Sequence, residues 1–131
     1  MKILIAEDDL TSRLFMNKYL SKYGTCDLAM NGMEAIDQVA SALEKQEPYN
    51  LICLDIMMPK VDGIKALKTI RELEETLLSS GQIPAKVIMT TALNDKDTVD
   101  EAYKLGCEAY AWKPIDIEKF NDVLKKLGLI H

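Results

Sequence analysis

The chain has 131 residues, the length of one ordinary domain, and its hydrophobic fraction of 48% is enough for one packed core. Its net charge of −5 argues against nucleic acid or an anionic membrane surface as a direct partner, since both attract basic surfaces. No apolar run approaches the ~20 residues that cross a bilayer, and the short apolar start reaches Glu7 too early for an export signal. The sequence therefore predicts a cytoplasmic protein without a membrane segment.

The cysteines and the histidine exclude several kinds of site. Cys26, Cys53 and Cys107 are far apart and lack a paired metal-ligand spacing, which is typical of free thiols in a reducing cytoplasm. The one histidine is His131, the last residue. An interior serine–histidine–aspartate triad, a cysteine–histidine pair and a histidine zinc site are therefore excluded.

Short apolar runs alternate along the chain with longer stretches whose apolar residues recur at helical spacing. The apolar runs predict strands at residues 3–6, 25–30, 51–55, 87–91 and 109–112. The periodic stretches predict helices at residues 11–22, 36–43, 64–77, 99–103 and 117–127. Strict alternation of strand and helix predicts one α/β domain over residues 1–131, with a parallel sheet covered by helices on both faces.

Polar side chains follow four of the predicted strands. They are Glu7-Asp8-Asp9, Asp55, Thr90-Thr91 and Lys113. Sites in parallel sheets lie at the carboxyl ends of the strands, so these groups should converge. Clustered carboxylates repel one another, and Mg²⁺ with oxygen ligands relieves that repulsion. Carboxylates, a hydroxyl and an ammonium group together are the parts of a phosphoryl-transfer site, in which a carboxylate can be the nucleophile.

Each of these residues, taken alone, also has a structural explanation. An aspartate after a strand is commonly a helix cap or turn residue, so Asp8 or Asp9 could cap the first helix and Asp55 could do the same for a later one. Lys113 alone is most often a solvated lysine. The joint occurrence at four separate strand ends favours the functional interpretation.

The same segments, in the same order, resemble the receiver domains of bacterial two-component response regulators. The resemblance rests on Glu7-Asp8-Asp9, residues 51–59, Asp62-Gly63, Thr90-Thr91-Ala92 and Lys113-Pro114, with Asn31 to Ala35 in addition. It covers essentially the whole chain and implies a flavodoxin-like, doubly wound sheet of five parallel strands in the order 2-1-3-4-5. It also implies a signalling protein of a phosphorelay, which catalyses only its own phosphorylation and dephosphorylation.

The resemblance implies a role for each residue of the metal site. Asp8 and Asp9 match the acidic pair that organises Mg²⁺, together with Asp55. Met57 would contribute its backbone carbonyl to the metal.

The resemblance also implies the residues that handle the phosphoryl group. Asp55 matches the phosphoacceptor, Thr91 the hydroxyl that engages the phosphoryl group, and Lys113 the lysine that pairs with it. Thr91 and Tyr110 match the switch positions, and the Lys113–Pro114 peptide bond would be cis. The fourth helix, fifth strand and fifth helix would then form the surface that docks an output protein.

Two features depart from the commonest pattern of the family. Residues 72–84 are expected to extend the third helix or its exit loop. Met57 and Leu93 occupy positions that are often polar elsewhere and that influence how water reaches the acyl phosphate, so slow autodephosphorylation is expected.

The implied phosphodonor is a histidine kinase or a histidine phosphotransfer protein, and the output partner is unknown. The leading expectation is a stand-alone receiver, although a piece of a longer regulator has the same pattern. Two alternatives stay open: an Mg²⁺-dependent phosphatase or phosphotransferase with Asp55 as nucleophile, and a docking module that needs no phosphorylation.

Overall fold

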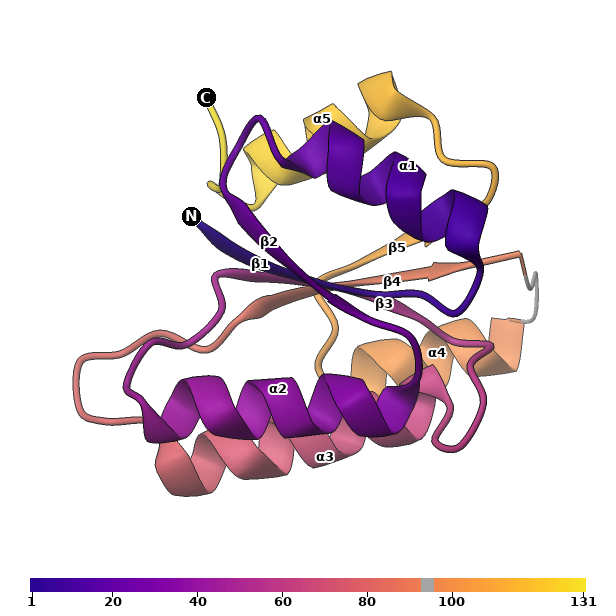
Figure 1. The fold of residues 1–131 in the computed structure, drawn as a ribbon. Helices are drawn as coiled ribbons and strands as arrows, with labels where there is room; N and C mark the ends of the chain where they lie inside the picture. Colours follow the sequence, from indigo (N-terminus) through magenta and orange to yellow (C-terminus); the bar gives the residue numbers. More distant parts are fainter. Residues whose placement is uncertain (93–95) are drawn as a thin grey trace.

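The computed structural model describes residues 1–92 and 96–131, in which five strands alternate with five helices (Figure 1). The strands are β1 (Lys2–Ala6), β2 (Thr25–Ala29), β3 (Leu51–Asp55), β4 (Lys86–Thr91) and β5 (Ala109–Trp112). The helices are α1 (Leu10–Leu20), α2 (Gly32–Glu44), α3 (Gly63–Leu77), α4 (Lys96–Lys104) and α5 (Ile117–Lys126). Segment 72–84 comprises the end of α3 and most of the loop that leads to β4. None of the helices in the described ranges is long and apolar enough to cross a membrane.

All strand pairs are parallel, and the sheet order is β2-β1-β3-β4-β5. Helices α1 and α5 cover one face of the sheet, and α2, α3 and α4 cover the other (Figure 1). Within β1, Leu4 and Ala6 pack into the core under α2 and α3, whereas Ile3 and Ile5 pack into the core under α1 and α5. This alternation is the period of two that a strand buried on both faces requires. The predicted doubly wound α/β fold is therefore confirmed.

Four helices begin at an Asp or Asn residue whose side chain accepts a backbone N–H three residues later. These caps are Asp9, Asn31, Asp62 and Asp116. Each satisfies one of the donors that the first turn of a helix leaves free. These caps lie at or near the carboxyl ends of the strands. They therefore set the residue at which each helix begins at that edge of the sheet.

Two glycines at this edge allow loops to approach closer than any side chain would permit. A Cβ atom on Gly32 would lie 1.8 Å from the carbonyl oxygen of Val61, and one on Gly63 would lie 2.3 Å from that of Asp55. Backbone therefore packs directly on backbone between the β2–α2 turn and the β3–α3 loop. The start of α3 is held against the end of β3 in the same way.

Arg71, Glu74 and Glu108 form a clamp at the opposite, amino edge of the sheet, which we call the Arg71 clamp. The Arg71 guanidinium donates to the carbonyl oxygens of Gly106 at 2.6 Å and Ala85 at 2.9 Å. It also pairs with Glu74 at 2.6 Å and Glu108 at 3.0 Å. Glu74 in turn accepts the backbone N–H of Ala85. The Arg71 clamp thus joins α3, the start of β4 and the turn between α4 and β5.

Candidate functional site

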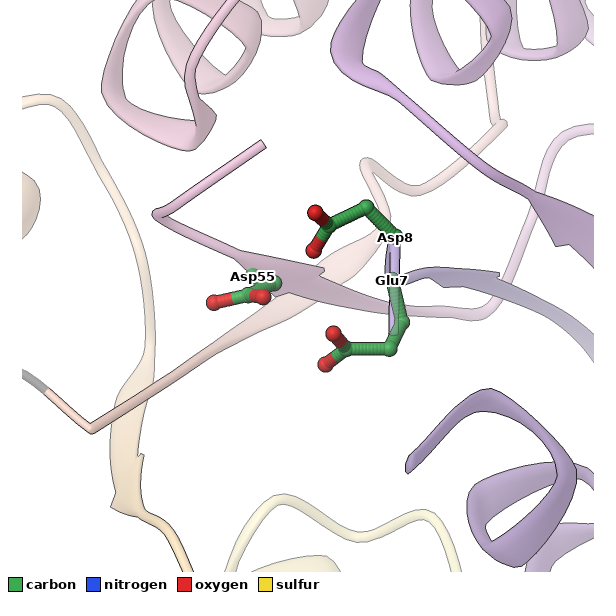
Figure 2. Close-up of side chains that lie close together, drawn as sticks. All are labelled: Glu7, Asp8 and Asp55. Atoms are coloured by element: carbon green, nitrogen blue, oxygen red, sulfur yellow. The ribbon is translucent and has the colours of Figure 1, made fainter. Parts of the chain in front are cut away.

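Three carboxylates, from Glu7, Asp8 and Asp55, lie together at the carboxyl edge of the sheet (Figure 2). Glu7 and Asp8 directly follow β1, Asp55 ends β3, and these strands are neighbours. One oxygen from each carboxylate lies within 4.8 Å of the others. Glu7 and Asp55 are each only 3% exposed, whereas Asp8 is exposed to solvent. An all-oxygen donor set of this kind, open on one side, fits a hard divalent cation such as Mg²⁺.

Lys113, which directly follows β5, neutralises part of this charge. Its Nζ atom contacts Glu7 Oε2 and lies 3.1 Å from Asp55 Oδ2. Its backbone N–H donates to the Thr91 carbonyl oxygen at 2.8 Å, so the lysine is tied to the end of β4 as well. One ammonium group against three carboxylates leaves an excess of negative charge, which a divalent cation would balance.

The surroundings of Glu7 and Lys113 shift the pKa values of both side chains. Burial and the nearby Asp55 carboxylate raise the pKa of Glu7 to about 7, although the hydrogen bond from Lys113 acts in the opposite direction. Burial alone would lower the pKa of Lys113, but its hydrogen bonds and the charges of Glu7 and Asp55 raise it above its ordinary value. Lys113 is therefore a permanent cation in the site.

The structure shows a helix-capping contact for one residue of the predicted acidic pair. Asp9 is not part of the carboxylate group; its Oδ2 atom accepts the backbone N–H of Ser12 at 2.9 Å and caps α1. This hydrogen bond lowers the pKa of Asp9. Glu7, the first residue beyond β1, is buried instead, and its carboxylate lies beside those of Asp8 and Asp55. The sequence held a signal for this, since an aspartate directly before the apolar start of a helix is a preferred cap.

The other predicted site residues lie at the same edge. Thr91 is the last residue of β4 and is fully buried, next to Thr90, which is the register partner of Asp55. The backbone N–H of Met57 donates to Asp55 Oδ1 at 3.3 Å, while the residue as a whole is 59% exposed. Leu93 lies outside the described residues.

The switch candidate lies on β5, the edge strand of the sheet, and the predicted cis bond directly follows that strand. The Tyr110 ring lies on β5, with its centroid 4.9 Å from that of Trp112. The peptide bond between Lys113 and Pro114 is cis, as the resemblance implies.

Two hollows border the carboxylate group, one lined by Asp8 and the other by Glu7. A cleft of about 710 Å³ runs from Asp8 and Met57 past Lys65 to Glu101 on α4. A smaller, more apolar hollow of about 250 Å³ borders Glu7 and Lys113 between α1 and the loop before α5. The first passes the exposed carboxylate, so an approaching group has an open route to the site.

Comparisons with known proteins agree on one family. The model of the response regulator receiver domain matches residues 3–125. The sporulation initiation phosphotransferase F of Bacillus subtilis is 33% identical over 126 residues, which are 95% of this chain and 91% of that protein. Other curated relatives are long histidine protein kinases, of whose length the chain spans only 5% or 10%.

Solved structures give the same result. The chain resembles a CheX–CheY–BeF3–Mg complex from Borrelia burgdorferi with a TM-score of 0.80 and 26% identity, over 98% of this chain and 89% of that one. It also resembles a Saccharomyces cerevisiae complex of the histidine phosphotransfer protein Ypd1 with the receiver domain of Ssk1. There the TM-score is 0.82 and the identity 27%, over 98% of this chain and 88% of that one.

Proposed function

The chain belongs to the family of response regulator receiver domains, which act in two-component phosphorelays, and from this membership we propose that Asp55 is the residue that accepts the phosphoryl group. The observation that carries the proposal is the position of Asp55 at the end of β3, where Lys113 pairs with it and the carboxylates of Glu7 and Asp8 lie beside it. Glu7 is also buried and pairs with Lys113, but it follows β1, whereas Asp8 is exposed to solvent.

The proposed reaction is a transfer between a phosphohistidine of a donor protein and the Asp55 carboxylate. An Asp55 oxygen attacks phosphorus, an O–P bond forms, and the N–P bond of the phosphohistidine breaks. The imidazole nitrogen leaves with the electron pair and takes up a proton. Lys113 holds an Asp55 oxygen in place before the attack and offsets the negative charge that the phosphoryl group brings.

Glu7, Asp8 and Asp55 would hold the Mg²⁺ that members of this family use, with the carbonyl of Met57 as a further predicted ligand. Mg²⁺ supplies charge neutralisation for the phosphoryl oxygens when bound. The exposed Asp8 leaves one side of the group open, and the cleft beside it gives the phosphoryl oxygens room. Asp9 remains the cap of α1 and is not assigned to the metal.

The proposed consequence of phosphorylation is a change of surface, not a reaction on another substrate. Phosphorylation adds about −1.5 to −2 charge at the junction of β3, β4 and β5. Thr91 and Lys113 are bonded through their backbones at this junction, so a displacement of one affects the other. Tyr110 and the exposed Trp112 on β5 would carry the change to an output protein.

The proposed phosphodonor is a histidine phosphotransfer protein or a histidine kinase. The yeast complex of a phosphotransfer protein with a receiver domain supports this choice through its likeness to the chain. We place the protein in the cytoplasm, in keeping with its three free cysteine thiols. The net charge of −5 supports a protein partner in preference to nucleic acid.

Acetyl phosphate labelling tests the proposal. The wild type, with Mg²⁺, should gain the mass of one phosphoryl group, and borohydride reduction followed by tandem mass spectrometry should place it on Asp55. Asp55→Asn should remain unlabelled. Asp37→Asn removes an exposed aspartate from α2 and should label as the wild type does. Labelling of Asp55→Asn, or full labelling in excess chelator, would contradict the assignment.

A further inference from the structure

Three successive carbonyl oxygens, those of Glu7, Asp8 and Asp9, all accept hydrogen bonds from one residue, Arg13. Its Nη1 atom donates to the Glu7 oxygen at 2.9 Å and to the Asp8 oxygen at 3.3 Å. Its backbone N–H donates to the Asp9 oxygen at 2.9 Å. We propose that Arg13 is a positioning residue for the Mg²⁺ site, because it fixes the backbone from which the carboxylates of Glu7 and Asp8 project.

Residues 7–9, which Arg13 contacts, lie between the end of β1 and the start of α1. The Glu7 N–H still donates to the Ala29 carbonyl, but the chain then turns away into α1. The Asp9 N–H folds back onto Glu7 Oε1 at 3.1 Å, and the Asp9 carboxylate is used by its cap. Among the described contacts, the guanidinium is what holds the carbonyl oxygens of Glu7 and Asp8.

The consequence of this anchoring is that one side chain on α1 sets the spacing of two carboxylates. Glu7 is buried and is also fixed by Lys113, whereas Asp8 is exposed and has more freedom. The place of the Asp8 carboxylate therefore depends most on its backbone. Groups that orient metal ligands without touching the metal commonly change metal affinity by about 10- to 100-fold when they are removed.

The charge of Arg13 and its proposed positioning role predict opposite changes in Mg²⁺ affinity when Arg13 is removed. A cation beside an acidic site opposes the binding of Mg²⁺, so its removal should tighten binding if charge alone matters. If Arg13 positions the ligands, its removal should weaken binding instead. The sign of the change in affinity therefore separates the two explanations.

The test is to titrate the wild type, Arg13→Met and Lys18→Met with Mg²⁺ and to measure binding from the shifts of the amide NMR signals. Lys18→Met removes an exposed cation from the same helix and is the matched control. We expect Arg13→Met to bind Mg²⁺ about tenfold more weakly, and Lys18→Met to bind it within about twofold of the wild type. The NMR spectrum without metal reports whether each variant is folded.

Tighter or unchanged Mg²⁺ binding by Arg13→Met would overturn the inference, as would an equal loss in Lys18→Met. If Arg13→Met does not fold, Arg13→Gln takes its place under the same criterion, since it also removes the charge and has a shorter side chain. The inference rests on the proposed Mg²⁺ site. Absence of any shift in the wild type would refute that site itself, whereas wild-type binding retained in the Arg13 variant would refute only the positioning role.

Discussion

The ammonium nitrogen of Lys113 lies 3.1 Å from Asp55 Oδ2 and at the same time contacts Glu7, so two buried carboxylates from neighbouring strands share one cation. Removal of that cation would leave both carboxylates buried without a counter-charge. The cost of such a loss is large, because a charged group in the interior has no water to replace its partner.

Lys113→Met should therefore lower the free energy of unfolding by about 2 kcal/mol near pH 8 without metal. Mg²⁺ should restore part of this loss, since it supplies positive charge to the same carboxylates. Urea unfolding with and without Mg²⁺ measures both effects. Lys119→Met, which removes an exposed lysine from α5, is the control and should change little. Wild-type stability of Lys113→Met in metal-free buffer would show that the shared pairing contributes nothing.

Arg71→Met should destabilise the fold by about 3 kcal/mol, because Glu74 and Glu108 would lose their cation and two carbonyl groups their donor. The rate of phosphorylation of the folded protein should stay close to that of the wild type, since the Arg71 clamp lies at the edge away from Asp55. Chemical unfolding and acetyl phosphate labelling test the two statements separately. Lys68→Met, an exposed position on the same helix, should alter neither. A labelling defect in Arg71→Met would reveal coupling between the two edges.

Gly63→Ala should disturb both stability and phosphorylation. The added Cβ would lie 2.3 Å from the Asp55 carbonyl oxygen and 2.7 Å from the Ile56 Cα, so the end of β3 must move. Overpacking of this kind costs about 2 kcal/mol. Gly81→Ala is the comparison: its Cβ meets nothing within 4 Å, although its φ of +87° strains any other residue. It should lose stability without slowing the labelling of Asp55. Equal labelling rates for the two variants would contradict the expected movement of Asp55.

Stability should fall at alkaline pH because of a buried thiol. Burial raises the pKa of the Cys107 thiol to about 11, so the folded protein keeps a proton that the unfolded chain releases from about pH 8.5. The unfolded state then binds fewer protons, and the free energy of unfolding decreases as the pH rises from about 8.5 towards 11. Titration of Cys107 should lower the free energy of unfolding by about 2 kcal/mol at about pH 10. Urea unfolding across this range measures it.

Cys107→Ala is the test of that assignment. It removes the titrating group, so its free energy of unfolding should decline less steeply between about pH 8.5 and 10 than that of the wild type. Burial raises the pKa of Cys53, Tyr19 and Tyr49 in the same direction, so a smaller decline should remain. Identical slopes for the variant and the wild type would exclude Cys107 as a contributor.

Met57→Asn should shorten the lifetime of the acyl phosphate several-fold. The backbone N–H of Met57 donates to Asp55 Oδ1. The Met57 side chain has no strong hydrogen-bonding group to orient an attacking water, whereas an amide has one. Loss of label after removal of acetyl phosphate gives the half-life. Met33→Asn changes an exposed methionine on α2 and should leave the half-life unchanged. An unchanged or longer half-life in Met57→Asn would refute the role of this position.

The convergence of side chains at Asp55 could be predicted from the strand pattern, because parallel strands bring their carboxyl ends to one edge. The order of the strands was expected only from the resemblance to receiver domains. The resemblance assigned Asp9 to the metal, whereas in the structure Asp9 caps α1 and Glu7 lies with Asp8 and Asp55. The predicted end of the first strand, residue 6, is the end of β1 in the structure, so the strand pattern is not the source of the difference. Three acidic residues follow that end in succession, and the resemblance alone selected two of them. The capping preference of aspartate was the information that separates Asp9 from Glu7.

The Arg71 clamp and the anchoring by Arg13 could not be predicted in the same way, because both depend on tertiary contacts. Arg71 meets Glu108 across 37 positions of sequence. A partial signal was present in α3, where Glu74 continues the apolar stripe of Leu67 and Ile70. A charged residue in such a stripe indicates a buried partner, but its identity depends on the packing of the neighbouring loops.

The Arg71 clamp has a consequence for how descendants of this sequence can diverge. Replacement of Arg71 would leave the buried Glu74 without its cation, whereas loss of either glutamate alone leaves Arg71 paired with the other, so we expect Arg71 to be the least replaceable of the three. The side chains of Leu10 and Met33, near the opposite edge, are exposed, so we expect single substitutions there to be tolerated. Sequence change at that edge should therefore leave the contacts among α3, the start of β4 and the turn before β5 intact.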